Sequence, residues 1–299
     1  MAPGPADPDE PSTAMAAVAG VVEVTVGSAT VRVVDTSGER YGDFWAALAD
    51  GTFEPATVDV LRGWARPDRL LVDVGAWIGP FALLAAAHGA TVVAVEPDPV
   101  AADVLRRNRA LNPELAGRVM IDEAAWAARD GSRSITAPEG LGNARSSLAV
   151  RRIRGPGADG AASVTVEVST RAAVSAFERA VADVRAETGR ALDAGDVLLK
   201  IDIEGGEFSV VPSLGPALAR QRPVLLLSVH QPPSTGRLRS LPRRVHRLPA
   251  MVRLLWALRG YRSVSRGNGH RELGWRRLGR VDRVLLAVRL GEFELLVEP

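Results

Sequence analysis

The sequence has no cysteine, a single lysine (Lys200) and few aromatic residues, which make up 5% of the chain. The lack of cysteine excludes disulfide bonds, thiolate metal sites and cysteine nucleophiles. The longest apolar stretch, residues 81–95, is interrupted by His88 and Gly89 and is too short to span a bilayer. Residues 1–11 contain no lysine or arginine, so they do not resemble a secretory signal. We therefore expect a soluble, cytoplasmic protein.

Charge is divided unevenly along the chain, whose 299 residues are 46% hydrophobic and 24% charged, as in globular proteins. Residues 231–299 hold 15 arginines and 5 acidic residues, a net charge of +10, whereas the remaining residues carry a net charge of −8. Such a basic segment forms either a solvated arginine-rich surface or a contact with nucleic acid, a membrane or an acidic substrate. We favour the solvated surface.

The order of expected strands and helices predicts an α/β fold. A flexible tail at residues 1–20 precedes an N-terminal cap at 21–66, which consists of a hairpin at 21–34 and helices at 41–49 and 57–64. Residues 67–299 then alternate between buried strands and helices, which is typical of a doubly wound, mostly parallel sheet.

The elements of this second part follow from apolar runs, turn residues and prolines at helix starts. Strands are expected at 70–74, 91–95, 119–121, 134–136, 147–150, 164–168, 197–203 and 224–229, and a closing antiparallel pair at 281–288 and 293–297. Helices are expected at 79–88, 100–111 with Asp98 as the N-cap, 171–188 and 249–258.

Ligands of doubly wound sheets bind beyond the carboxyl ends of the strands, and polar residues follow three strands of this sheet. The first strand ends in Asp73, and Gly75 and Gly79 then let the backbone turn sharply beside a ligand. The second ends in Glu96, which suits the two hydroxyls of a ribose, and the third ends in residues 122–123, which suit an adenine amino group. These residues predict a site for an adenosine-containing cofactor.

The loop after the first strand favours S-adenosylmethionine over a dinucleotide. Trp77 occupies the middle position where a dinucleotide loop has the glycine that pyrophosphate approaches. Asp73 repels phosphate but suits an ammonium or a sulfonium group.

Several stretches, in order over residues 51–230, resemble the FkbM family of S-adenosylmethionine-dependent methyltransferases. The matching stretches are GTFEP at 51–55, LVDVGAWIG at 71–79, VEPDP at 95–99, LRRNRALN at 105–112, AA at 124–125, NARSSL at 143–148, LKIDIEGGE at 199–207 and PVLLLSVH at 223–230. The resemblance implies a class I methyltransferase (Rossmann-like) fold and transfer of a methyl group, usually to an oxygen of a sugar or natural product. The chain departs from the family pattern at Trp77, Ala172 and Ser228.

The cofactor-binding residues predicted from the strand ends and the matching stretches are Asp73, Gly75, Ala76, Trp77, Gly79, Glu96, Pro97, Asp122, Glu123 and Ala124. An alcohol acceptor also benefits from a base near its proton. His230, Asp202 and Glu204 lie where the fourth and fifth strands end, and we predict that they are catalytic, with His230 as the base. Glu207 lies close by, in the first turn of the following helix, and Lys200 is expected to neutralise part of this acidic cluster. Two neighbouring carboxylates do not complete a magnesium site, so we expect no metal.

Two other functions remain open from the sequence. The basic segment at 231–299 would serve an RNA-directed methyltransferase if its few aromatic residues stacked on bases. The departures from the family pattern would also fit a cofactor-binding protein without catalytic activity. Our leading expectation is a small-molecule or glycan acceptor, with no membrane partner and no nucleic acid.

Overall fold

The computed structural model describes residues 20–34, 41–137, 140–142, 163–230, 243–267, 275–279 and 293–299. The expected tail lies outside the described residues except for its last position, and so do the expected strands at 147–150 and 281–288 and the stretch at 143–148.

The strands are β1 (Val21–Val26), β2 (Ala29–Val34), β3 (Leu70–Val74), β4 (Thr91–Val95), β5 (Val119–Asp122), β6 (Ala125–Ala127), β7 (Gly131–Ala137), β8 (Val164–Ala172), β9 (Val197–Ile201), β10 (Val224–Val229), β11 (Ser263–Gly267), β12 (Trp275–Arg277) and β13 (Phe293–Glu298). The helices are α1 (Gly42–Ala49), α2 (Pro55–Trp64), α3 (Pro80–Ala87), α4 (Pro99–Ala110), α5 (Pro113–Ala116), α6 (Ala173–Thr188), α7 (Glu207–Gln221) and α8 (Arg243–Ala257).

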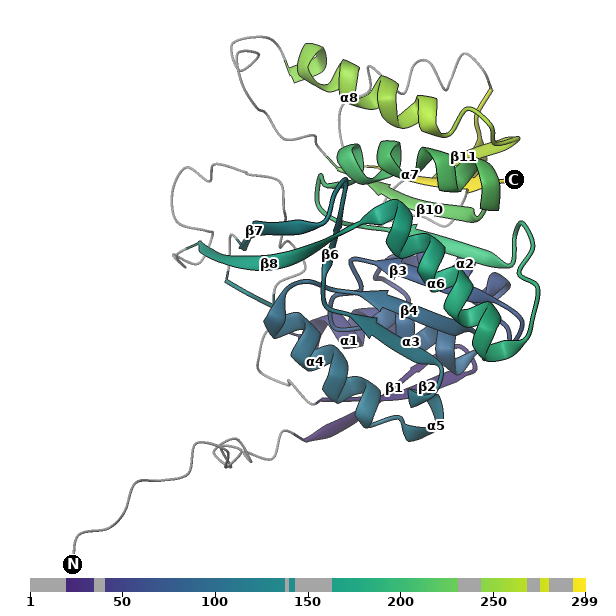
Figure 1. The fold of residues 1–299 in the computed structure, drawn as a ribbon. Coiled ribbons are helices and arrows are strands. Elements are labelled where there is room, and N and C mark those ends of the chain that lie inside the picture. The colour runs from purple at the N-terminus through teal and green to yellow at the C-terminus, as the bar shows by residue number, and fades with distance from the viewer. Residues whose placement is uncertain are drawn as a thin grey trace, which may run out of the picture.

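The large central sheet has the order β12-β11-β13-β10-β9-β3-β4-β5 (Figure 1). Strands β3, β4, β5, β9 and β10 pair in parallel, and β13 lies antiparallel to both β10 and β11. The prediction of a doubly wound, mostly parallel sheet is confirmed. Of the expected closing pair at 281–288 and 293–297, only the second strand is described, as β13, which pairs with β10 and β11. The chain proceeds from β3 to β4 and β5 in one direction and later to β9 and β10 in the other, so the topological switch point lies between β3 and β9.

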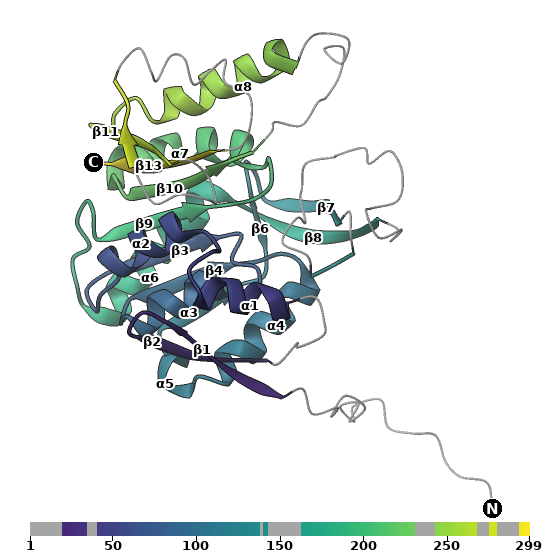
Figure 2. The ribbon, with the colours of Figure 1, turned by 180° about the vertical axis from the view of Figure 1, so that it is seen from behind.

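Both faces of the sheet are covered, because alternate residues of the buried strands point to opposite sides. One face packs against α6, α7 and α8, and the other packs against α3, the helices α1 and α2 and the β1–β2 hairpin. Figures 1 and 2 show these two sides in turn. A smaller sheet of β6, β8 and β7 lies beside the end of β5 and leads into α6.

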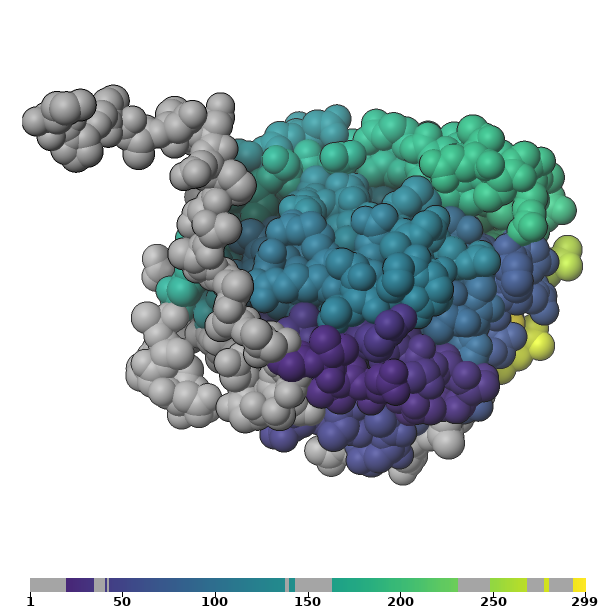
Figure 3. Space-filling view, turned by 90° about the horizontal axis from the view of Figure 1, so that it is seen from below, coloured from purple at the N-terminus to yellow at the C-terminus, as the bar shows by residue number. Residues whose placement is uncertain are grey.

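Two buried asparagines, one on α4 and one just before α5, attach the N-terminal hairpin to this part of the chain. The side chain of Asn108 accepts a hydrogen bond from the Val34 N–H at 2.8 Å and donates one to the Ile78 carbonyl at 2.9 Å. Asn112 accepts from the Arg32 N–H at 2.8 Å and donates to the carbonyl of the same residue at 2.6 Å. Figure 3 shows the hairpin, in purple, lying along the blue-teal segment that contains α4 and α5. The cap and the sheet therefore share one hydrophobic core.

Several predicted boundaries were wrong; for example, the helix expected at 57–64 begins at Pro55. The helix expected to begin at Pro249 begins at Arg243, so Pro249 lies inside it. Proline is common at helix starts and disfavoured in helix interiors, which is why the sequence pattern placed the start too late. The strand expected to reach residue 203 ends at Ile201, because the chain turns before Glu204, which has a positive φ of 50°. Strand β8 runs on to Ala172, so α6 begins two residues later than expected.

Candidate functional site

The polar residues predicted from the sequence gather at the carboxyl ends of β3, β4, β9 and β10, at the switch point of the sheet. The loop after β3 is held by the end of β4, because the N–H groups of Gly75 and Ala76 donate to the Val95 carbonyl at 2.9 and 3.0 Å. The loop after β9 is held by β3, because the Asp202 N–H donates to the Val74 carbonyl at 2.9 Å.

Gly75 is required by the close approach of these two loops. Its φ is +86°, and a Cβ atom at this position would lie 1.9 Å from the carbonyl oxygen of Asp202. Gly79 has a φ of +90°, and a Cβ atom there would lie 2.3 Å from a methyl carbon of Leu105. The two glycines therefore allow the loop to turn against both β9 and α4.

Glu96 follows β4 and is almost fully buried. One carboxylate oxygen accepts a hydrogen bond from the Trp77 N–H and the other accepts from the Asp98 N–H, each at 2.8 Å. Burial raises the pKa of Glu96 to about 7, although these two backbone hydrogen bonds favour the charged form. Each carboxylate oxygen keeps a second lone pair, so Glu96 can still accept hydrogen bonds from a diol. Pro97 connects it to Asp98, whose side chain caps α4 as predicted.

The Trp77 ring contacts residues of the N-terminal cap. Its backbone has a positive φ of 51°, and its indole N–H donates to the Gly142 carbonyl at 2.8 Å. The rings of Tyr41 and Phe44 lie edge-on to the indole, with centroids 5.5 and 4.6 Å away. The Gly142 N–H in turn donates to Asp98 at 2.8 Å. Trp77 thus joins the loop after β3 to α1 and to residue 142.

The residues at the end of β5 and just after it separate into an inner and an outer group. Asp122 accepts from the Ala124 N–H at 3.1 Å and lies 3.3 Å from the Arg171 guanidinium. Asp122 and Arg171 both line a pocket of about 170 Å³ between β4, β5 and α6. Glu123 is exposed and forms an ion pair with Arg106 on α4. Of these predicted residues, only Glu123 lies at the protein surface.

A buried group of charges lies beneath the two loops. The Lys200 ammonium, whose side chain is 3% exposed, is 3.2 Å from Asp73 and 3.8 Å from Asp202. Burial favours the neutral amine, but Asp73, Asp202 and Glu54 outweigh it and hold the pKa of Lys200 above its usual value. Burial and Asp202, with a further contribution from Glu294, raise the pKa of Glu54 to about 8. The sequence prediction did not include Glu54 or Glu294 in the site, although Glu54 lies in the GTFEP stretch.

His230 lies at the end of β10 among three carboxylates. Its Nε2 atom is 3.5 Å from Asp202 and 3.7 Å from Glu204, and its Nδ1 atom is 3.4 Å from Glu207. The fully buried Glu207 also accepts hydrogen bonds from the N–H groups of His230 at 2.7 Å and Gly205 at 2.8 Å. Burial disfavours the imidazolium, but the three carboxylates outweigh it and raise the pKa of His230 to about 10.

The structure brings together all three predicted catalytic residues. The side chains of Asp202 and Glu204 are 21% and 18% exposed, so a polar molecule can reach them beside the imidazole. Within the described ranges, no three or more His, Asp and Glu side chains are arranged to hold a metal ion. Nor does that part of the chain contain a helix long and apolar enough to cross a bilayer.

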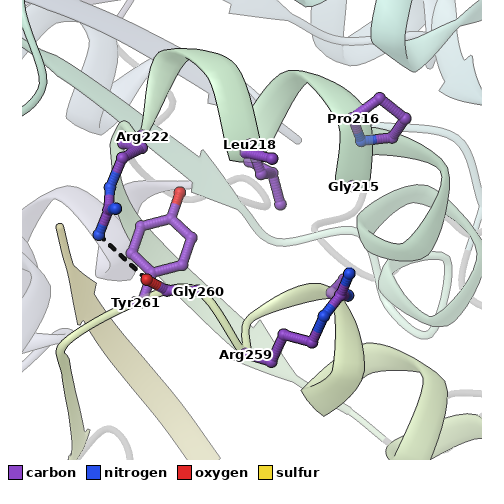
Figure 4. A pocket seen from close by; sticks show the side chains of 9 residues that line it. Gly215, Pro216, Leu218, Arg222, Arg259, Gly260 and Tyr261 are labelled. Carbon is purple, nitrogen blue, oxygen red and sulfur yellow. Dashed lines mark hydrogen bonds between the residues drawn. The ribbon is translucent and has the colours of Figure 1, made fainter.

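A further pocket of about 430 Å³ lies at the other end of α7 (Figure 4). Arg222, Tyr261 and Arg259 line it together with Leu218 and Pro216, and Arg222 donates to the Gly260 carbonyl at 3.0 Å. The residues of α7 that line this pocket begin at Gly215, which lies about 12 Å along the helix from Glu207, given a rise of roughly 1.5 Å per residue. None of the predicted site residues belongs to it.

Comparison with known proteins identifies the family. Residues 73–263 match the methyltransferase FkbM domain. The chain is similar to the crystal structure of methyltransferase FkbM from Methylobacillus flagellatus KT, with 14% identity over 88% of this chain and 62% of that one, and a TM-score of 0.39. It is also similar to a SAM-dependent methyltransferase from Agrobacterium tumefaciens, with 12% identity over 93% of this chain and 70% of that one, and a TM-score of 0.42. No curated protein matches the chain.

Proposed function

The chain belongs to the FkbM methyltransferase family, and from this membership we propose that it transfers a methyl group from S-adenosylmethionine to a hydroxyl oxygen of a sugar or a natural-product small molecule. S-adenosylmethionine is the cofactor of the family, and the class I, Rossmann-like fold agrees with the order of the central sheet. The chain spans 62% of the length of the Methylobacillus protein, so the acceptor is proposed from the site and not from that protein.

The observation that carries the proposal is the junction of the loops after β3 and β9 at Gly75, with Glu96 buried beside it. Glu96 suits the hydroxyls of a ribose, because both of its oxygens retain acceptor capacity. The net negative charge of the carboxylates around Lys200 and His230 favours a cationic ligand over a phosphate. When bound, S-adenosylmethionine supplies an electrophilic methyl carbon on a positively charged sulfur.

We propose that the group formed by His230, Asp202 and Glu204 removes the proton from the acceptor hydroxyl. The Nε2 atom of His230 faces the two partly exposed carboxylates, so a hydroxyl placed among them has a nitrogen and two oxygens within reach of its proton. Glu207 fixes the imidazole from the opposite side through Nδ1. Holding an acceptor in line with the transferred group supplies roughly 7–11 kcal/mol of the barrier in well-oriented reactions.

The proposal is tested in two separate measurements. Calorimetry with S-adenosylhomocysteine measures cofactor binding, and incubation with labelled S-adenosylmethionine and a library of sugars and natural-product alcohols measures methyl transfer. We expect binding, and transfer to a hydroxyl that His230→Gln reduces while binding persists. Binding with transfer only to RNA or to nitrogen would reject the proposed acceptor, and binding without any transfer would favour a cofactor-binding protein without catalytic activity.

A further inference from the structure

Helix α8 carries a row of exposed apolar side chains on its outer side. Leu248, Val252 and Trp256 are 39%, 50% and 65% exposed, and their four-residue spacing places them along one side of the helix. We call these three residues the α8 ridge. They are three of the seven large apolar side chains that are exposed in the described part of the chain. An aligned row of this kind marks an interaction surface more strongly than scattered residues do.

The ridge is not needed to hold α8 on the protein. Met251, Leu254 and Leu258 are buried and belong to the core that includes α7, and they lie on a different side of the helix from the ridge. Figures 1 and 2 show α8 as the outermost helix beyond α7. The ridge therefore faces outward from a helix whose packing is already complete.

The helix that carries the ridge has a cationic sequence. Residues 243–257 contain four arginines and no acidic residue, within a segment of net charge +10. Arg253 is exposed, and the guanidinium of Arg259 lies 4.4 Å from the ring centroid of Trp256. Leucine, valine and tryptophan flanked by arginine are typical of helices that lie in the interface of an anionic membrane, where the tryptophan ring sits at the level of the headgroups.

This charge decides between possible partners. Two copies of the chain that met through α8 would bring two arginine-rich, acid-free helices together, which is unfavourable. A nucleic acid would engage the arginines but would leave Leu248 and Val252 exposed. An anionic lipid surface accepts both kinds of side chain.

We propose that the α8 ridge docks the protein on membrane surfaces that carry anionic phospholipids. The expectation of no membrane partner followed from the absence of a spanning segment, which a helix lying on a surface does not require. This inference does not depend on the proposed methyl acceptor, because its test measures lipid binding without any methyl transfer.

The test is sedimentation of the full chain with vesicles of phosphatidylcholine and phosphatidylserine, beside vesicles of phosphatidylcholine alone. We expect binding to the anionic vesicles that weakens as salt increases. Trp256→Ser should weaken this binding about tenfold and Val252→Ser about fivefold, because each removes apolar surface that the lipid covers. Val164→Ser is the matched control, since Val164 is 41% exposed on β8, outside the ridge.

Thermal unfolding of each variant confirms that an exposed substitution has left the fold intact. The proposal is overturned if the wild-type chain does not sediment with anionic vesicles at low salt, or if Val252→Ser and Trp256→Ser bind as tightly as Val164→Ser. It is also overturned if light scattering detects a dimer that Trp256→Ser abolishes and no vesicle binding accompanies it. That result would assign the ridge to contacts between copies.

Discussion

The role of His230 as a base predicts a steep dependence of methyl transfer on pH. The carboxylates of Glu207, Asp202 and Glu204 raise the pKa of His230 to about 10, so the imidazole is almost entirely protonated at neutral pH and cannot accept a proton. While the pH stays below this pKa, each increase of one pH unit raises the neutral fraction of His230 about tenfold. Between pH 7 and pH 9 we therefore expect kcat/KM to rise about a hundredfold, because this parameter reports the free enzyme.

The assay is initial-rate transfer of labelled methyl with the acceptor found in the library screen, at constant ionic strength. A rise that levels off near pH 8 would implicate Glu54 instead, because its pKa is raised to about 8. A flat profile from pH 7 to pH 9 would refute the reasoning and assign the proton to Asp202 or Glu204. In His230→Gln the rise should disappear together with most of the turnover.

The same raised pKa affects stability in the opposite direction. The charged imidazole stabilises the fold fully below its unfolded pKa of about 6.5, and this contribution is lost as the pH rises toward 10. Circular dichroism at each pH is therefore the control, and rates count only where the folded signal is unchanged.

Three further predictions concern the charges and loops of the site. Lys200→Met should lower the free energy of unfolding by about 3–5 kcal/mol in chemical denaturation, because it leaves Asp73 buried without its cation. The double variant with Asp73→Asn should recover part of this loss. A loss below about 1 kcal/mol in Lys200→Met would contradict the buried ion pair. Gly75→Ala should abolish S-adenosylhomocysteine binding in calorimetry, because the added Cβ atom would clash with the Asp202 carbonyl. Gly117→Ala is the control, because a Cβ atom at Gly117 has open space around it and this variant should bind normally. Equal binding by the two variants would show that the loops after β3 and β9 can move apart. Glu96→Gln should weaken the same binding about tenfold or more, because the amide nitrogen replaces one acceptor of a backbone N–H; unchanged affinity would place the ribose elsewhere.

The sequence was sufficient to predict the parallel strands of the central sheet, because they are short, continuous apolar runs that end in or near polar residues. The N-cap at Asp98 and the helix that follows it were predicted for the same kind of local reason, a capping side chain before a proline. Local patterns were insufficient for α8, where Pro249 lies inside the helix and not at its start. They were also insufficient for β11 and β12, which are short and gain their hydrogen bonds from strands distant in the sequence.

The candidate site was predicted less completely because it depends on contacts over long sequence separations. The order of the strand ends is a property of the fold, so Glu96, Asp202 and His230 could be placed at one edge of the sheet. The sequence pattern around Glu54, which directly precedes α2, does not indicate that its side chain is buried beside Lys200. Nor does the sequence indicate that the Trp77 ring turns toward α1.

The burial of Lys200 has a practical consequence for labelling the protein. It is the only lysine of the chain, and its ammonium is enclosed and held in its protonated, non-nucleophilic form by neighbouring carboxylates. Amine-directed dyes and cross-linkers should therefore leave Lys200 unmodified in the native state and react with it only after unfolding.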